Sequence, residues 1–341
     1  MKNRLHFIDY SKSIGIYLVV LGHTVLSSMF HNFIYAFHMP LFFAISGILF
    51  SVNKGATFKS FFLKRFKQLI VPYFILNIIT YLFWLFIGRK FGSDIALNIP
   101  IYKPLLGILY GNGIDNYLQH CTSLWFIPCL FIVENIYFIF SSQKKLILIA
   151  SFVLLGFADY YFALPRLPWG INIAFTAIIF YIIGNTFKNY IIKYETSLNS
   201  NALIFGTSLI VLFFLSKING NVDMDNRMYS NYLLFILSGI SGIIMILSCS
   251  KILEGIFSGS KLLVFISNGT IVILAFHAIA GSIIRGVTLF IFHIPITIYD
   301  NKIINSALYS ILSIVILMPL MYVLERYFPQ MIGKNKLQVK S

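Results

Sequence analysis

The chain has 341 residues, of which 58% are hydrophobic and only 11% are charged. A soluble domain of this size carries roughly 25% charged residues, so the composition excludes a soluble globular fold and predicts a single membrane domain over residues 1–341. The net charge of +15 does not indicate nucleic-acid binding, because the basic residues lie in short segments between apolar runs. The three cysteines have no metal-site or redox spacing, and we expect no metal.

Ten apolar runs come close to the length of about 20 residues that a membrane-spanning helix needs. They predict an all-α protein with about ten transmembrane helices. The predicted spans are 11–30, 33–52, 67–88, 122–140, 145–160, 169–187, 201–216, 231–249, 262–281 and 303–324. The apolar stretch 281–299 either extends the ninth span or forms a re-entrant piece, so the count is good to about one helix. The long segment 89–121 is predicted to be an extracytoplasmic loop.

The basic residues give these spans a direction. With a cytoplasmic N-terminus, 18 of the 26 Lys and Arg residues fall in cytoplasmic segments and 8 in outer segments. Basic residues concentrate in cytoplasmic loops, so this excess predicts that both termini are cytoplasmic. The eight outer residues are Arg89, Lys90, Lys103, Arg166, Lys217, Arg227, Arg285 and Lys302.

The first span carries a basic residue and a histidine on one face. Lys12 and His23 are 11 residues apart, which at 100° per residue is about 20° beyond three full turns. The rise of about 16 Å puts His23 about halfway across the hydrocarbon core. Burial there would keep the imidazole neutral, and a neutral imidazole can take a proton from an attacking hydroxyl group. From its position alone, His23 is equally well explained as a buried histidine that only hydrogen-bonds a neighbouring helix.

Glu134 in the fourth span and His277 in the ninth are the other ionisable residues at depth. Ionisable side chains are costly inside a membrane and indicate functional sites by default. A carboxylate could orient the imidazole of His23. For Glu134, however, we favour an interhelical hydrogen bond by the protonated acid over a catalytic role.

Lys64, Arg65 and Lys67 form a basic cluster at the cytoplasmic end of the third span. Anchoring by the positive-inside rule accounts for part of it. Arg and Lys also bind phosphates, so the cluster is a candidate site for the phosphates of a cytosolic donor such as coenzyme A. The absence of a Gly-rich phosphate loop argues against a nucleoside triphosphatase.

Four motifs, in order along most of the chain, carry a family resemblance. The first runs from Ile8 to Lys12 and is followed by Gly22-His23. The others are Phe37-His38-Met39-Pro40-Leu41-Phe42-Phe43 with Ser46-Gly47, then Leu63-Lys64-Arg65-Phe66-Lys67-Gln68 with Pro72-Tyr73, then Ser123-Leu124-Trp125-Phe126-Ile127-Pro128 with Ser267-Asn268-Gly269-Thr270 and His277. Together they resemble the acyltransferase-3 family of membrane O-acyltransferases, close to its fucose 4-O-acetylase-like group. Lys12 stands where arginine is common, and Gln68 replaces the second arginine of the third motif.

The resemblance implies a ten-helix fold and transfer of an acyl group, usually acetyl, from cytosolic acyl-CoA to a hydroxyl of a cell-surface or lipid-linked glycan. It implies His23 as the catalytic histidine, Lys12 as its basic partner and Arg65 as the donor-binding base, supplemented by Lys64 and Lys67. The expected partners are acetyl-CoA, the glycan and the lipids of a bacterial cell membrane, with no nucleic acid and no metal. The alternatives are a succinyl donor, a glycolipid transporter or flippase, and a membrane subunit without chemistry.

Overall fold

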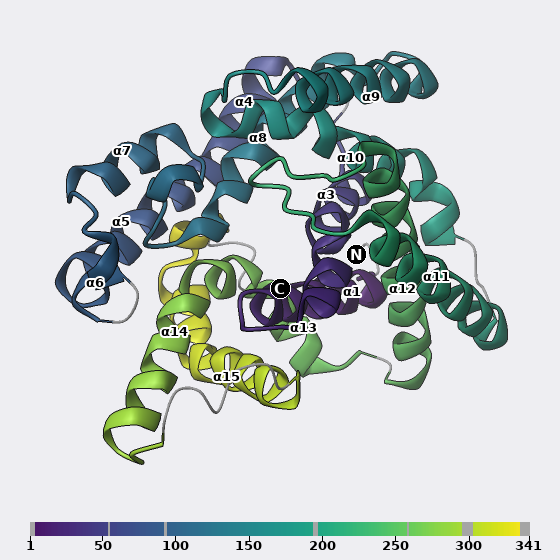
Figure 1. Ribbon diagram of the computed structural model, residues 1–341. Coiled ribbons are helices and arrows are strands. Elements are labelled where there is room, and N and C mark those ends of the chain that lie inside the picture. Colours follow the sequence, from purple (N-terminus) through teal and green to yellow (C-terminus); the bar gives the residue numbers. More distant parts are fainter. Residues whose placement is uncertain are drawn as a thin grey trace. The chain divides into compact units, whose positions relative to one another are not determined.

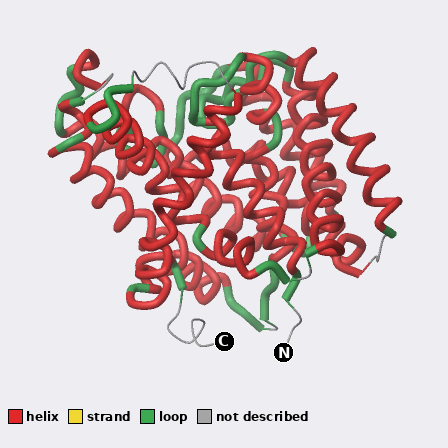
Figure 2. Tube along the Cα trace, turned by 90° about the horizontal axis from the view of Figure 1, so that it is seen from below, coloured by secondary structure: helices red, strands yellow, loops and turns green. Residues whose placement is uncertain are grey.

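The structure is a computed structural model that describes residues 4–53, 55–91, 94–193, 197–257, 259–294 and 303–334. Within these ranges the chain is built from helices and connecting loops, as Figures 1 and 2 show, with one isolated β-bridge between Asp223 and Met228. Some basic residues used to orient the spans lie outside the described ranges. They are Lys2, Lys54, Lys302, Lys336 and Lys340.

Nine helices in the described ranges are long and apolar enough to cross a membrane. They are Ser28–Leu49, Phe58–Lys90, Thr122–Phe140, Lys145–Phe162, Pro168–Lys193, Leu198–Asn219, Tyr232–Ile256, Thr270–Phe290 and Ile303–Tyr327. Each of them overlaps a predicted span. The prediction of an all-α protein with many membrane-spanning helices is confirmed.

The first predicted span, 11–30, is wrong in its limits. Helix α1 (His6–Gly22) has 17 residues, the lower limit of the range of about 17–25 that a crossing needs. Where the helix stops, the backbone N–H and the hydroxyl of Thr24 both donate to the carbonyl of Leu21, at 3.0 and 2.7 Å. The chain resumes with α2 (Ser28–Tyr35) and α3 (His38–Leu49), which together form the first candidate span.

The contacts divide the chain into two compact units. The first unit comprises residues 1–51, 142–164 and 175–270. Its helices are α1, α2, α3, α9 (Lys145–Phe162), most of α10 (Ile171–Lys193), α11 (Leu198–Asn219), α12 (Tyr232–Ile256) and α13 (Lys261–Asn268). The second unit comprises residues 52–141, 165–174 and 271–341. Its helices are α4 (Phe58–Arg65), α5 (Val71–Phe86), α6 (Asp94–Leu97), α7 (Tyr102–Tyr110), α8 (Phe126–Phe140), α14 (Thr270–Phe290) and α15 (Ile303–Tyr327).

In the first unit, α1 packs against α3, α12 and α13, and α11 packs along α12. Helices α3 and α10 approach each other with their backbones in contact. A Cβ atom added at Gly47 would lie 2.0 Å from the carbonyl oxygen of Tyr181, and one added at Gly184 would lie 2.1 Å from that of Ala44. Small residues thus permit the close approach from both sides, as they do in many membrane helix pairs.

In the second unit, a π turn joins α4 to α5. Residues Phe66–Ile70 form the turn, and the N–H of Val71 bonds the carbonyl of Phe66 five residues earlier. Pro72 explains the departure from α geometry, because it has no N–H to offer the carbonyl of Gln68 and its ring crowds that carbonyl. The helix nevertheless continues, and α4, the π turn and α5 belong to the candidate span Phe58–Lys90.

The contact between α3 and α10 can be tested with an added methyl group. Gly184→Ala is expected to lower the stability of the protein by about 1–3 kcal/mol, because the methyl would collide with the carbonyl of Ala44. Gly206 in α11 is the matched control, since nothing lies within 4 Å of a Cβ atom there. Gly206→Ala is expected to be neutral or to stabilise by up to about 1 kcal/mol through helix propensity. Thermal unfolding midpoints of the purified variants in detergent measure both effects, and equal midpoints would contradict the contact.

Candidate active site

The predicted site residues fall in both units. Lys12 and His23 belong to the first unit. The second unit holds Lys64, Arg65, Lys67, Glu134 and His277. Among the described residues, no group of three or more His, Cys, Asp or Glu side chains is arranged to hold a metal ion.

Buried polar side chains fix α1 in the first unit. Tyr10, Ser11 and Ser13 are buried, and the hydroxyl of each forms a hydrogen bond with the segment 250–263. Tyr10 donates to the carbonyl of Phe257, Ser13 donates to the carbonyl of Leu263 at 2.6 Å, and Ser11 Oγ lies 2.8 Å from Ser250 Oγ. Since each lost bond would leave a buried polar group unpaired, these contacts hold the helix that carries Lys12 in a defined position.

Two motifs of the sequence meet at the start of α1. The carboxylate of Asp9 accepts hydrogen bonds from Arg4 at 2.7 and 3.1 Å and from the hydroxyl of Ser267 at 2.7 Å. Arg4 also donates to the amide oxygen of Asn268 at 3.0 Å. The first motif is therefore bound to the Ser267–Thr270 motif, which precedes α14, and both contribute to positioning α1.

His23 is the first residue beyond α1, and its backbone is no longer helical. Its side chain is exposed in the described structure, whereas Lys12, 11 residues earlier, is partly buried. The expectation that the side chain of His23 is buried among other side chains is therefore wrong. The reason is that the helix ends at Gly22, so His23 leaves the packed face that α1 presents to its neighbours.

Arg65 and Glu134 form a two-pronged ion pair between α4 and α8. Nε and Nη2 of Arg65 donate to the two carboxylate oxygens, and Nη1 donates to the amide oxygen of Gln68 at 2.7 Å. The Glu134 side chain is 5% exposed and that of Arg65 25%. This two-pronged geometry suits an ionised carboxylate. The contact between the two helices is therefore an ion pair, whereas from the sequence we favoured a hydrogen bond by a protonated acid. Gln68, three residues after Arg65, thus adds a further contact to the guanidinium.

Lys64 and Lys67 flank Arg65 and differ from it in their surroundings. Both side chains are exposed, and neither forms an ion pair within the part of the chain that the structure describes. The charge of Arg65 is balanced by Glu134, so the two lysines present open positive charge beside this ion pair.

His277 is buried in α14, one turn beyond the carbonyl groups of Ile273 and Leu274. Its Nδ1 lies 3.0 Å from each of these two oxygens. The hydroxyl of Ser123 donates to the same Leu274 carbonyl at 3.1 Å. The Ser123–Pro128 motif and His277 thus meet on the backbone of α14.

His120 is a histidine that the sequence analysis did not single out. It is 6% exposed and lies in the second unit, where Nε2 is 2.9 Å from the side-chain oxygen of Asn77 on α5. Burial lowers the pKa of His120 to about 4. A polar side chain in the middle of an apolar span, as Asn77 is, was the available signal that a partner would be needed.

The ion pair of Arg65 with Glu134 can be tested by removing one partner or both. Glu134→Gln is expected to destabilise the protein by on the order of 3 kcal/mol, because a largely buried guanidinium loses its counter-charge. The double variant Arg65→Met with Glu134→Leu is expected to lose less than Glu134→Gln alone, since no unpaired charge remains. Unfolding midpoints in detergent are the measurement, and a double variant that is less stable than the single one would contradict the pairing.

Comparison with known proteins identifies one matching family. Residues 5–326 match the family model of the acyltransferase-3 family, described as an acyltransferase domain. No curated protein and no solved structure shows a significant match to the chain. The match extends from the start of α1 into the last turn of α15 and includes all the predicted site residues. The protein therefore belongs to the acyltransferase-3 family and is a membrane acyltransferase.

Proposed function

We propose that the protein transfers an acyl group, by preference acetyl, from cytosolic acyl-CoA to a hydroxyl group of a cell-surface or lipid-linked glycan, with His23 as the general base. Membership of an acyltransferase family supports the reaction class. The observation that carries the role of His23 is its position: an exposed imidazole at the end of a helix that is itself held by buried hydrogen bonds.

The end of α1 is electrostatically suited to a base. Carbonyl groups at a helix C-terminus carry partial negative charge and favour a nearby cation by about 0.3–1 kcal/mol at an exposed position. A histidine that removes a proton becomes an imidazolium in the transition state. The position of His23 directly after Gly22 therefore stabilises the charge that the proposed step creates, and its exposure leaves the ring accessible to a substrate.

In the proposed reaction, His23 takes the proton of the acceptor hydroxyl as its oxygen attacks the thioester carbonyl of acyl-CoA. A C–O bond forms, the C–S bond breaks, and the thiolate of coenzyme A receives the proton back from the imidazolium. The products are the glycan ester and free coenzyme A. Lys12 contributes positive charge on the helix that directly precedes His23.

For the donor, we propose that Lys64 and Lys67 bind the phosphates of acetyl-CoA beside Arg65. The two lysines are exposed, and the charge of Arg65 is already shared with Glu134. The excess of basic residues in the segments that include this cluster supports a cytoplasmic location for it, as a cytosolic donor requires. We place the protein in the bacterial cell membrane, with both termini in the cytoplasm.

The role of His23 is tested by His23→Ala in cells that depend on this protein for glycan modification. The O-acyl content of the isolated glycan, measured by mass spectrometry, is expected to fall to the level of cells without the protein. General acid–base catalysis contributes typically 10²–10⁴-fold, so no intermediate level is expected. His293→Ala is the matched control, an exposed histidine outside the proposed site. Unchanged O-acyl content in His23→Ala at normal expression would refute the assignment, and transport of unmodified glycan would favour the flippase alternative.

The donor site is tested by Lys64→Gln combined with Lys67→Gln. The half-saturating concentration of acetyl-CoA is expected to rise by roughly tenfold, because two charge-assisted phosphate contacts are lost. The rise should shrink at high salt, where exposed charges are screened. Lys59→Gln, which removes an exposed lysine from the same helix, is the control. Equal donor saturation in the double variant and the control would place the phosphates elsewhere.

A further inference from the structure

One face of α5 is covered by α7 and the loop that follows it. Two tyrosines of α5, eight residues apart, mark the contact. Tyr81 donates to the carbonyl of Ile101 at 3.2 Å, and Tyr73 donates to the carbonyl of Ile108 at 2.8 Å. Helix α7 therefore runs beside α5 from Tyr81 back toward Tyr73, and the chain then returns to His120.

Asn77 lies between the two tyrosines and is fully buried. Its amide nitrogen donates to the carbonyl of Tyr73 at 2.8 Å, which leaves its oxygen facing His120 Nε2 at 2.9 Å. An amide oxygen only accepts hydrogen bonds, so the ring nitrogen that faces it carries the imidazole proton. The other nitrogen of the neutral ring, Nδ1, is then an acceptor.

That second nitrogen, Nδ1, is buried and has no hydrogen-bond partner among the described residues. Buried polar atoms nearly always have a partner, and an exception requires an explanation. The lowered pKa of His120 keeps the ring neutral near pH 7, so Nδ1 offers a lone pair. The edge of the ring also packs against Tyr81, with centroids 5.8 Å apart. The nitrogen therefore suits a ligand that donates a hydrogen bond.

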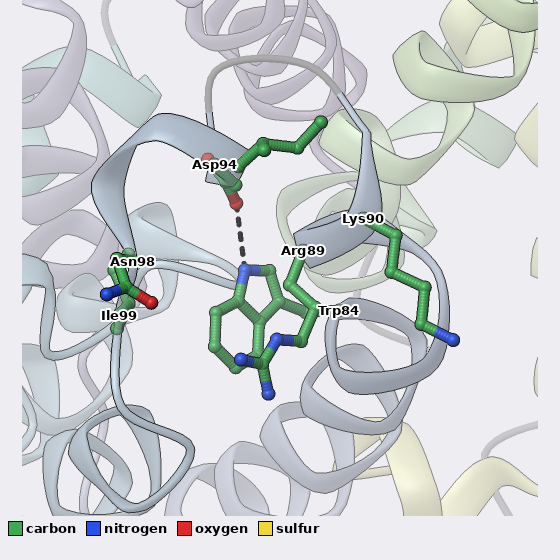
Figure 3. A pocket seen from close by; sticks show the side chains of 7 residues that line it. Trp84, Arg89, Lys90, Asp94, Asn98 and Ile99 are labelled. Atoms are coloured by element: carbon green, nitrogen blue, oxygen red, sulfur yellow. Dashed lines mark hydrogen bonds between the residues drawn. The ribbon is translucent and has the colours of Figure 1, made fainter.

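A cavity of about 170 Å³ lies farther along α5, and Figure 3 shows side chains that line it. It is lined by Trp84, Arg89, Lys90, Asp94, Ile95, Asn98 and Ile99. The carboxylate of Asp94 accepts from the indole N–H of Trp84 at 2.8 Å and from the side chain of Gln119 at 2.9 Å. Gln119 directly precedes His120, so a residue that hydrogen-bonds Asp94 of the cavity wall is the chain neighbour of the buried imidazole. Trp84 and Asn77 are seven residues apart, about 10 Å along the helix.

We propose that Nδ1 of His120 accepts a hydrogen bond from a hydroxyl group of the glycan acceptor, which enters from the cavity beside Trp84. The inference rests on the proposed function, because the glycan supplies the hydroxyl donor. The charged and amide groups of the cavity wall suit a ligand rich in hydroxyl groups. A sugar without a hydroxyl at the matching position would leave the buried nitrogen unpaired, which is the kind of mismatch that gives strong discrimination. His120 would therefore help to select the sugar that is modified.

Two substitutions of His120 separate this role from a structural one. In His120→Gln, the side-chain N–H₂ can still donate to Asn77 in place of Nε2, but no acceptor remains at the Nδ1 position. In His120→Asn, the shorter side chain keeps an acceptor at the Nδ1 position and loses the contact with Asn77. If His120 is only structural, the Gln variant should resemble the wild type and the Asn variant should be impaired. If His120 binds a hydroxyl group of the acceptor, acceptor use should instead be impaired in the Gln variant and largely kept in the Asn variant.

The experiment uses the purified full-length protein in lipid nanodiscs with radiolabelled acetyl-CoA as donor. Graded dilutions of the unfractionated lipid-linked glycan extract of producing cells serve as the acceptor. For His120→Gln, the half-saturating amount of extract is expected to rise about tenfold, with the half-saturating acetyl-CoA concentration and the unfolding midpoint close to wild type. For His120→Asn, acceptor saturation should stay within about threefold of wild type while the unfolding midpoint falls.

If His120→Gln saturates with the acceptor as the wild type does, the proposal is overturned and the proposed function still stands. The same holds if acceptor saturation worsens only in variants whose unfolding midpoint falls. A wild-type protein that transfers no label to the extract would overturn the proposed function, and this inference with it. His23→Ala, assayed in parallel, separates the two cases because it addresses the chemical step and not acceptor binding.

Discussion

The second unit depends on one backbone constraint, the proline at position 72. Arg65 and Asn77 are 12 residues apart, which in an uninterrupted α-helix would place them about 120° apart around the axis. The π turn that Pro72 imposes takes up one extra residue. The effective separation is then 11 steps, about 20° beyond three turns. Arg65 and Asn77 therefore point to the same side of a helix that runs from Phe58 to Lys90. Without the π turn, the two polar side chains would face different neighbours.

The neighbour on that side is the segment that leads into α8 and continues along it. Glu134 of α8 meets Arg65, and His120, which precedes α8, meets Asn77. In a membrane, polar side chains without partners are costly, so the paired placement is a condition for folding as well as a feature of the site. It also leaves two features exposed at opposite ends of one helix: the lysine charges beside Arg65 and the cavity beside Trp84. A donor with phosphates and an acceptor with hydroxyl groups would each find suitable chemistry at its own end.

The sequence was sufficient for the class of fold and for most spans, because apolar length and charge content respond directly to the membrane. The span 122–140 was predicted to the residue. The end of α1 was missed, since apolar residues continue past Gly22 and the stop is marked by local hydrogen bonds, such as those from Thr24 to the carbonyl of Leu21. The pairing of Arg65 with Glu134 and of His120 with Asn77 joins residues 69 and 43 positions apart. No periodicity encodes such contacts, so the sequence could supply the polar residues at depth but not their partners.

The two histidines illustrate why depth alone is a poor guide to a base. A general base must carry a positive charge in the transition state, and burial in apolar surroundings opposes that charge. His120, buried and with a pKa lowered to about 4, is therefore suited to accept a hydrogen bond without taking the proton. His23 has the opposite setting, exposed and next to the carbonyl end of α1, where a positive charge is favoured. From the sequence we expected a buried, neutral imidazole for the base, and the structure gives these surroundings to His120. The chemistry of His120 fits orientation of the acceptor, whereas proton removal fits His23 at the end of α1.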